Sequence, residues 1–339
     1  MKISVVVPVL NARQTMPLCI DALLHQVRLP DAIYVVDNGS TDGTYEWLKE
    51  RSREEPLLRL LREAKCGPSA ARNAALRIVE DGIVAFTDAD CVPELQWLDA
   101  LTAELTEHDV AAVAGSVIGY QPRTLVERYS SIIGYALPDQ PCVVHRCSPF
   151  VGFATVNMAV RTTVLRRLGG FDEEMITNED FDLSWRILKE GGTIAYVPHA
   201  RVAHIYRSSL CAMLKRLFEY GTFRPSLIAK HFRGVALVAI RSHVIEIRGP
   251  STLFVNLTSP EKVSLALIGL SALSPWALGL LALYWVRLAL LVKRAAKRRG
   301  VAVRSPGELM MLTGLHLLQF CASNAGSLIA SPRYGALCV

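Results

Sequence analysis

Short runs of β-branched residues alternate with helix-period segments over the first 115 residues of the chain. The apolar runs predict strands at Ile3 to Val7, Ala32 to Val36, Ile83 to Phe86 and Val110 to Gly115. The segments between them predict helices from Met16 to Val27, Thr44 to Arg53, Ser69 to Glu80 and Trp97 to Glu107. This alternation is typical of an α/β fold with a mostly parallel sheet covered by helices.

The pattern weakens after about residue 120 and then recovers. Arg161 to Leu168 and Glu179 to Lys189 have helical spacing, and strand-like runs follow at Thr193 to Val197 and Arg201 to His204. We expect these elements to complete the same domain. The chain is thereby divided into a main domain over residues 1–210, a basic amphipathic connector over 211–262 and an apolar helical region over 263–339.

The last third of the chain is apolar and basic. Ser264 to Val292 is 29 residues long with Arg287 as its one charge, which is long enough to span a bilayer. The basic run Lys293 to Arg299 follows directly, and Leu309 to Ile329 is a further apolar segment with a few polar residues. The region therefore predicts a membrane-associated end, made of spans or interfacial helices.

Charge also divides the chain. Residues 1–205 carry 20 basic and 27 acidic side chains, whereas residues 206–339 carry 17 basic and 4 acidic ones. The acidic part argues against nucleic acid as a partner, and the basic part suits an anionic membrane surface. The chain begins directly on a strand-like run, so we expect no cleaved signal peptide and a first part on the cytoplasmic side of the cytoplasmic membrane. The eight cysteines lack a Cys-x-x-Cys pair, which favours reduced thiols.

The position of the basic run after the apolar stretch leaves more than one arrangement in the membrane open. A single crossing after a cytoplasmic domain would place Lys293 to Arg299 outside, against the positive-inside tendency. A re-entrant hairpin that bends near Pro275 would return both of its ends to the cytoplasmic face. A buried hairpin of a soluble protein is the third alternative, although a stretch with so few charges is unusual in a soluble core.

Polar residues follow three of the predicted strands where each strand ends. Ligands bind beyond the carboxyl ends of parallel strands, so we expect one neighbourhood made of Pro8 to Asn11, Asp37 to Asp42 and Asp88 to Cys91. Asp88 and Asp90 are one residue apart, so in extended backbone their carboxylates point to the same face. Two such acids repel each other unless a cation stands between them, and Mg²⁺ or Mn²⁺ with phosphate oxygens in its shell suits them. The alternative is a solvated turn.

Three other positions are candidates for chemistry. Asp37 lies at a strand end where a nucleobase or ribose would bind, while Ser40 to Asp42 are suited to cap the next helix. Arg72 lies at a helix start, within reach of either an anionic phosphate or an acidic loop. Asp180 lies in the first turn of a helix, where the macrodipole stabilises a carboxylate.

Six short motifs resemble those of family 2 glycosyltransferases. They occur in the family's order over roughly residues 1–210, and they are Pro8 to Asn11, Val35 to Thr44, Ala70 to Asn73, Thr87 to Asp90, Gly169 to Glu173 and Glu179-Asp180. No single motif is decisive, but six in register are specific. The resemblance implies the type A glycosyltransferase fold, a Rossmann-like sheet with flanking helices. It also implies a nucleotide-sugar donor, a divalent metal, Mg²⁺ or Mn²⁺, and inversion at the anomeric carbon.

The resemblance further implies roles for individual residues. Asp180 matches the family's catalytic base, and Asp88 and Asp90 match its diphosphate and metal pair. His204 resembles a late histidine that approaches the metal, with His199 as the competing choice. The nucleotide-sugar-binding residues that we expect are Pro8, Val9, Asn11, Asp37, Arg72, Asp88, Ala89, Asn157 and Glu179.

We therefore expect an inverting, metal-dependent enzyme that moves a sugar to a hydroxyl of a lipid-linked or envelope-glycan acceptor presented at the membrane. Trp185 and Arg186 resemble a pair found in processive synthases, but the preceding glutamines are absent, which favours single transfers. A sugar-nucleotide or nucleotidyl transferase is the alternative enzyme, although no phosphate-cradling Gly-rich loop follows the first strand. A non-catalytic membrane scaffold that keeps the fold is the other alternative.

Overall fold

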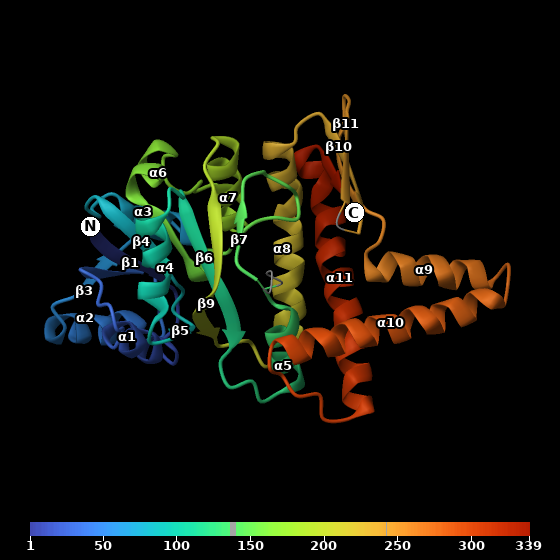
Figure 1. Ribbon diagram of the computed structural model, residues 1–339, viewed down its shortest axis with the longest axis horizontal. Coiled ribbons are helices and arrows are strands. Elements are labelled where there is room, and N and C mark those ends of the chain that lie inside the picture. Colours follow the sequence, from blue (N-terminus) through green and yellow to red (C-terminus); the bar gives the residue numbers. More distant parts are fainter. Residues whose placement is uncertain (136–139, 242) are drawn as a thin grey trace. The chain divides into compact units, whose positions relative to one another are not determined.

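A computed structural model describes residues 1–135, 140–241 and 243–339 of the chain. Its internal contacts divide the chain into two compact units. The first consists of residues 1–121 and 135–206, and the second of residues 122–134 and 207–339. The first unit is an α/β structure, whereas the second is mainly helical with a small sheet (Figure 1).

A nine-stranded sheet forms the centre of the first unit. Its strands are β1 Lys2–Val9, β2 Ala32–Asp37, β3 Leu58–Arg62, β4 Gly82–Phe86, β5 Cys91–Pro93, β6 Ala112–Gly119, β7 Cys142–Val144, β8 Met158–Arg161 and β9 Ile194–His204. They are ordered β3-β2-β1-β4-β8-β6-β9-β5, with β7 paired to β9. The strands from β3 to β4 and the pair β6 and β9 run parallel, whereas β8, β5 and β7 run antiparallel to their neighbours.

Helices pack on both faces of this sheet (Figure 1). They are α1 Met16–Leu24, α2 Thr44–Glu54, α3 Pro68–Leu76, α4 Trp97–Glu107, α6 Thr162–Arg167 and α7 Glu179–Lys189, with a short 3-10 turn η1 at Thr155–Asn157. Ile20 of α1 and Leu101 of α4 bury their side chains in one core, while Ala71 of α3 and Leu183 of α7 belong to the core on the other face. The predicted α/β architecture with a mostly parallel sheet is confirmed.

Two predicted boundaries of the first unit are wrong in detail. The helix expected over Ser69 to Glu80 ends at Leu76, after which the chain turns into β4. The two strands expected over 193–197 and 201–204 are one strand, β9. It stays paired with β6 through a register shift between Gly115 and Ser116, and this irregularity absorbs the residues that separate the two runs.

Within residues 122–134, 207–241 and 243–339, the second unit contains five helices and four strands. These are α5 Leu125–Ile133, α8 Leu210–His231, α9 Pro260–Ser271, α10 Trp276–Arg298 and α11 Pro306–Tyr334, with β10 Val235–Ile240, β11 His243–Arg248, β12 Thr252–Asn256 and β13 Ala336–Cys338. One apolar core takes Tyr129 from α5, Met213 from α8, Val292 from α10 and Leu312 from α11. Beside it, Arg128 of α5 donates from Nε to Oε1 of Glu308 at 2.9 Å, a buried ion pair within this unit.

The small sheet is absent from the sequence-based prediction. Residues 211–262 are expected as one basic connector, but they form α8 followed by β10, β11 and β12. The short apolar run Val235–Ile240 is itself typical of a strand. The 29-residue apolar stretch is broken near Pro275, and α9 and α10 lie side by side as a hairpin (Figure 1).

Candidate functional site

The carboxyl ends of β1, β2 and β4 meet at one edge of the sheet. Val9 of β1 pairs with Asp37, the last residue of β2. Val6 of β1 pairs with Phe86, the last residue of β4. The backbone N–H of Asn11 donates to Oγ of Ser40 at 3.0 Å, and Oδ1 of Asn11 accepts from the N–H of Thr41 at 2.8 Å. The loops that follow β1 and β2 are therefore in direct contact, as the sequence predicts.

Asp37 is fully buried beneath the loop that follows β2. Its carboxylate accepts from the N–H groups of Gly39 at 3.2 Å and Ser40 at 3.3 Å, and Nε of Arg62 lies 3.5 Å from Oδ2. These bonds fix the shape of the loop. In this conformation the Asp37 carboxylate supports the loop that follows β2.

Arg72 of α3 lies between two carboxylates. Its side chain is 3% exposed, and its two terminal nitrogens donate to Oε1 of Glu179 at 2.7 Å and Oδ1 of Asp88 at 2.9 Å. Of the two partners expected for this arginine, a phosphate or an acidic loop, the structure shows the acids. The ion pairs join the end of β4 to the start of α7, and the acids at both ends of this link, Asp88 and Glu179, are predicted to bind the nucleotide-sugar.

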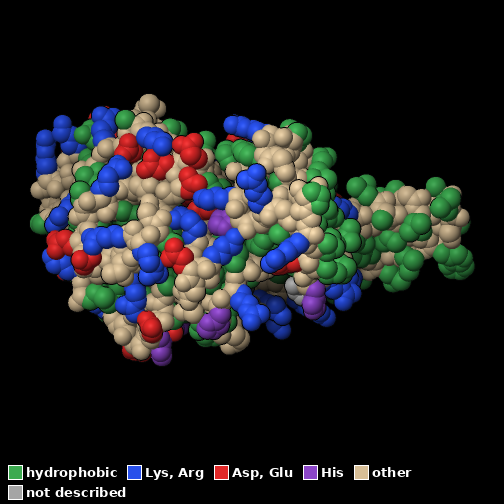
Figure 2. Space-filling model, turned by 90° about the horizontal axis from the view of Figure 1, so that it is seen from above, with side chains coloured by type: hydrophobic (Ala, Val, Ile, Leu, Met, Phe, Trp, Pro, Cys, Tyr) green, Lys and Arg blue, Asp and Glu red, His purple; other side chains and the backbone are tan. Residues whose placement is uncertain are grey.

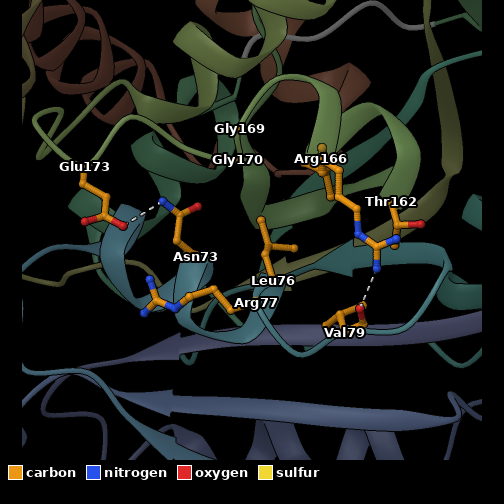
Figure 3. A pocket seen from close by; sticks show the side chains of 10 residues that line it. Asn73, Leu76, Arg77, Val79, Thr162, Arg166, Gly169, Gly170 and Glu173 are labelled. Carbon is orange, nitrogen blue, oxygen red and sulfur yellow. Dashed lines mark hydrogen bonds between the residues drawn. The ribbon is translucent and has the colours of Figure 1, made fainter.

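Asn73, the next residue on α3, holds the loop that leads to α7. Its amide nitrogen donates to the carbonyl of Phe171 and to Oε1 of Glu173, both at 2.9 Å, and its Oδ1 accepts from the N–H of Phe171 at 2.9 Å. Gly170 has a φ of +75°, and a Cβ there would lie 2.5 Å from Oδ1 of Asn73, so this turn requires glycine. Figure 3 shows Asn73 facing Glu173, with Gly169 and Gly170 beside them.

A cavity of about 290 Å³ lies beside the same loop (Figure 3). Arg77 and Arg166 line it, but both are already paired, Arg77 with Glu63 at 2.7 Å and Arg166 with Asp81. The other lining residues are Asn73, Leu76, Val79, Thr162, Leu165, Gly169, Gly170 and Glu173. The candidate acids at the strand ends are not among them, so this cavity is separate from the place where the acids gather.

Asp180 occupies the first turn of α7 and is half-buried. Its Oδ1 accepts from the N–H of Phe181 at 2.8 Å. Burial, followed by repulsion from Glu179, raises the pKa of Asp180 to about 7. The sequence argument expected the helix macrodipole to favour the charged form, but burial and the neighbouring acid outweigh it.

Asp90, Cys91 and His204 offer ligand atoms within 4.8 Å of one another. The pairing of β5 with β9 places Cys91 beside His204, and Nε2 of His204 lies 3.6 Å from Oδ1 of Asp90. Nδ1 of His204 is buried and has no hydrogen-bond partner in the part of the chain that the structure describes, whereas His199 is exposed. Burial raises the pKa of the Cys91 thiol well above its usual range, which leaves the carboxylate and the imidazole as the natural ligands.

Asn157 is buried and its amide group is occupied. Oδ1 accepts from Nε1 of Trp97 at 2.8 Å, and Nδ2 donates to the carbonyls of Ser116 at 2.7 Å and Ala200 at 2.9 Å. These hydrogen bonds link η1 to α4, β6 and β9. Asn157 is predicted to bind the nucleotide-sugar, and in the structure its amide group holds backbone segments together.

Two residues beside the acids are missing from the predicted site. The ring of Phe171 lies 5.5 Å from the guanidinium carbon of Arg72, and Cys91 has its ligand atom within 4.8 Å of those of Asp90 and His204. Phe171 belongs to the Gly-Gly-Phe motif, so a signal for it existed in the sequence. Cys91 ends the predicted strand-end segment Asp88 to Cys91, but its closeness to His204 depends on the pairing of β5 with β9, which no local pattern predicts.

Residues 4–169 match the protein family described as Glycosyl transferase family 2. Glycosyltransferase AglE of Haloferax volcanii is 30% identical over 225 residues, which cover 65% of this chain and 71% of that protein. Pre-mycofactocin glycosyltransferase of Mycobacterium tuberculosis is 33% identical over 169 residues, which cover 49% of this chain. The matched region spans 36% of the length of that relative.

A solved structure resembles nearly the whole chain. Mannosyltransferase PcManGT from Pyrobaculum calidifontis, in complex with GDP-Man and Mn²⁺, has a TM-score of 0.58 at 22% identity. The likeness covers 96% of this chain and 87% of that one and confirms the type A glycosyltransferase fold. Motif order, fold and relatives agree, and the chain belongs to glycosyl transferase family 2.

Proposed function

We propose that the protein transfers a sugar from a nucleotide-sugar donor, with inversion at the anomeric carbon, to a hydroxyl of an acceptor presented at a membrane. The observation that carries this proposal is the network in which Arg72 joins Asp88 and Glu179, next to Asp180. It gathers acids at the strand ends of a fold whose solved relative holds GDP-Man and Mn²⁺. Pro8 and Val9 at the end of β1, Asn11 in the loop that follows, and Asp37 at the end of β2 are assigned to the nucleoside.

Asp180 is assigned as the catalytic base. The acceptor oxygen forms a bond to the anomeric carbon as the bond from that carbon to the diphosphate oxygen breaks. The electron pair leaves with the nucleoside diphosphate, and the acceptor proton passes to the carboxylate of Asp180. Arg72 is assigned a positioning role rather than direct contact with the diphosphate, because both of its terminal nitrogens are engaged by acids.

The residues Asp88, Asp90 and His204 fit a divalent cation, Mg²⁺ or Mn²⁺. Nε2 of His204 and Oδ1 of Asp90, which lie 3.6 Å apart, form a donor pair suited to such an ion, and Nδ1 of the same ring is buried without a partner among the described residues. When bound, the ion would supply positive charge to the departing diphosphate. Ala89 lies between the two acids and keeps their strand-end spacing.

The second unit supports the membrane part of the proposal. Helix α10 is long and apolar enough to cross a membrane, and only 17% of its apolar window is buried within the protein. We place the protein at the cytoplasmic membrane with its first unit in the cytoplasm. The acceptor assigned to it is a lipid-linked molecule or an envelope glycan.

The test of the proposed reaction is a donor screen. The full chain, in detergent with membrane lipid extract, is given one nucleotide-sugar at a time, and release of nucleoside diphosphate is measured with and without Mn²⁺. Release from at least one donor that requires both Mn²⁺ and the extract is the expected result. A chain that binds nucleoside diphosphate but releases none from any donor would instead be a scaffold.

Replacing Asp90 or His204 by Ala is expected to weaken Mn²⁺-dependent binding of nucleoside diphosphate by about tenfold or more, because each change removes a ligand. Thermal shift or calorimetric titration with and without Mn²⁺ measures the effect. His199→Ala is the matched control, because His199 lies on the same strand but is exposed. Equal losses for the two histidines would argue against the proposed metal site.

Turnover is expected to fall in acid. Burial raises the pKa of Asp180 to about 7, so the ionised base is lost as the pH falls through that value. The kcat should then drop about tenfold per pH unit below about 7. A pH–rate profile at saturating donor and Mn²⁺ measures this limb. A limb near pH 4, the ordinary range of aspartate, would show that Asp180 is not the titrating base.

A further inference from the structure

The α9–α10 hairpin of the second unit exposes an unusual number of apolar side chains. In Figure 2 the hairpin is the projection at the right, and hydrophobic side chains are spread over its visible face. Twelve large apolar side chains are exposed along it, namely Leu265, Ile268, Leu270, Leu273, Trp276, Leu278, Leu280, Leu283, Trp285, Val286, Leu290 and Leu291. Soluble monomers rarely expose contiguous apolar patches larger than a few hundred Å², so this surface requires a partner.

Exposure is greatest at the tip of the hairpin and lowest at its base. Leu273 and Trp276, on the two sides of the turn, are 85% and 84% exposed. Leu288 and Val292, farther along α10, are buried, and Val292 packs in the core shared with α5, α8 and α11. The base is therefore anchored in the second unit, while the side chains of Leu273 and Trp276 at the tip stay exposed in the described part of that unit.

The two arms have the same uncharged length. Leu273 lies eleven positions after Lys262 on one side of the turn, and Arg287 lies eleven positions after Trp276 on the other, with no charged residue between Lys262 and Arg287. At the helical rise, each arm is roughly 16 Å long. One leaflet of a bilayer contributes about 15 Å of hydrocarbon, half of the full core. Each arm thus matches one leaflet.

The charges beyond this length favour an anionic lipid surface. Along α10, exposed Lys293, Arg294 and Lys297 follow Arg287. No acidic residue occurs between Glu261 and Glu308, and both of these glutamates are buried. Basic side chains that follow an apolar helix place their charges among anionic head groups.

We infer that the α9–α10 hairpin enters one leaflet of an anionic bilayer and stops near its midplane. Leu273 and Trp276 lie deepest, and Lys262 and Arg287 lie at the head groups. Helix α10 is long enough to cross the membrane, but it does not cross, because α9 returns beside it with an arm of the same uncharged length. The inference rests on the membrane association proposed above and does not depend on sugar transfer.

Depth-dependent fluorescence quenching distinguishes a one-leaflet hairpin from a crossing. Leu273→Cys and Leu283→Cys are made in the full chain after the exposed Cys66, Cys211 and Cys321 are changed to Ser, and each new thiol carries an environment-sensitive fluorophore. Both leucines are exposed, at 85% and 67%, so the label should be tolerated. The vesicles contain phosphatidylcholine and phosphatidylglycerol, with a spin label either near the end of the acyl chain or on the head group.

A one-leaflet hairpin and a crossing predict opposite orders for the quenching ratios at positions 273 and 283. In a one-leaflet hairpin, the ratio of deep to shallow quenching is above one at position 273 and lower at position 283. A crossing by α10 reverses this order, because position 283 is then near the midplane and the tip reaches the opposite head groups. Reversal, or no quenching at either position, overturns the inference. Nucleotide release by the same variants reports on the proposed reaction separately, so the two failures are distinguishable.

Discussion

Replacing Asp180 by Asn is expected to lower kcat by about 10²- to 10⁴-fold and to leave the affinity for nucleoside diphosphate unchanged. The amide keeps the shape of the side chain and the bond to the N–H of Phe181, but it cannot accept the proton of the acceptor hydroxyl. Single-turnover nucleotide release with saturating donor measures the rate. Calorimetric titration of nucleoside diphosphate in the presence of Mn²⁺ measures the affinity.

Asp99→Asn is the matched control for this change. Asp99 also lies in the first turn of a helix, α4, but it is exposed. Its replacement should leave both kcat and affinity unchanged. If Asp180→Asn kept its turnover, the base would be another residue, and if it lost nucleotide affinity, Asp180 would belong to donor binding.

Replacing Arg72 by Met is expected to lower the free energy of unfolding by about 3 to 5 kcal/mol, the usual cost of removing one partner from a buried ion pair. The change leaves the nearly buried Glu179 and the adjacent Asp88 without their shared cation. Repulsion between these acids and Asp180 then opposes the packing of α7 against the end of β4. Urea unfolding followed by tryptophan fluorescence measures the loss.

Arg77→Met is the control for the loss of a charge from the end of the same helix. Arg77 pairs with Glu63 at a similar distance, 2.7 Å, but its side chain is 60% exposed. An exposed pair contributes about 1 kcal/mol or less, so this variant should be nearly as stable as the unchanged chain. Equal losses at the two positions would contradict the distinction between them. Arg72→Lys, which keeps the charge but not the two-pronged geometry, should fall between these variants.

The sequence predicted which strand ends lie together, because the evidence for that was local. The alternation of β-branched runs with helix-period segments predicts β1, β2 and β4. A parallel arrangement of these strands brings their carboxyl ends to one edge of the sheet. It did not predict the partner of Arg72. Glu179 is 107 residues away along the chain, and only tertiary packing selects it over a phosphate.

Properties that depend on burial were predicted least well. The helix start of Asp180 was visible in the sequence, but the surroundings that raise its pKa come from distant segments. Asn157 lies in a glycine-containing segment that suggests a ligand loop, yet its amide bonds reach carbonyls 41 and 43 residues away. Strand β13 pairs with β12 although α9, α10 and α11 lie between them in the sequence. No local periodicity predicts a pairing over that separation.

The placement of α5 in the second unit has a consequence for synthesis on the ribosome. Arg128 of α5 and its partner Glu308 are 180 residues apart, so at 5 to 20 residues per second Glu308 is made roughly 10 to 40 seconds later. During that interval Val126, Tyr129 and Ile132 have no α11 to pack against. The nascent chain must keep an apolar helix from aggregating until almost all of the polypeptide has been translated, which makes early contact with a membrane or a chaperone valuable.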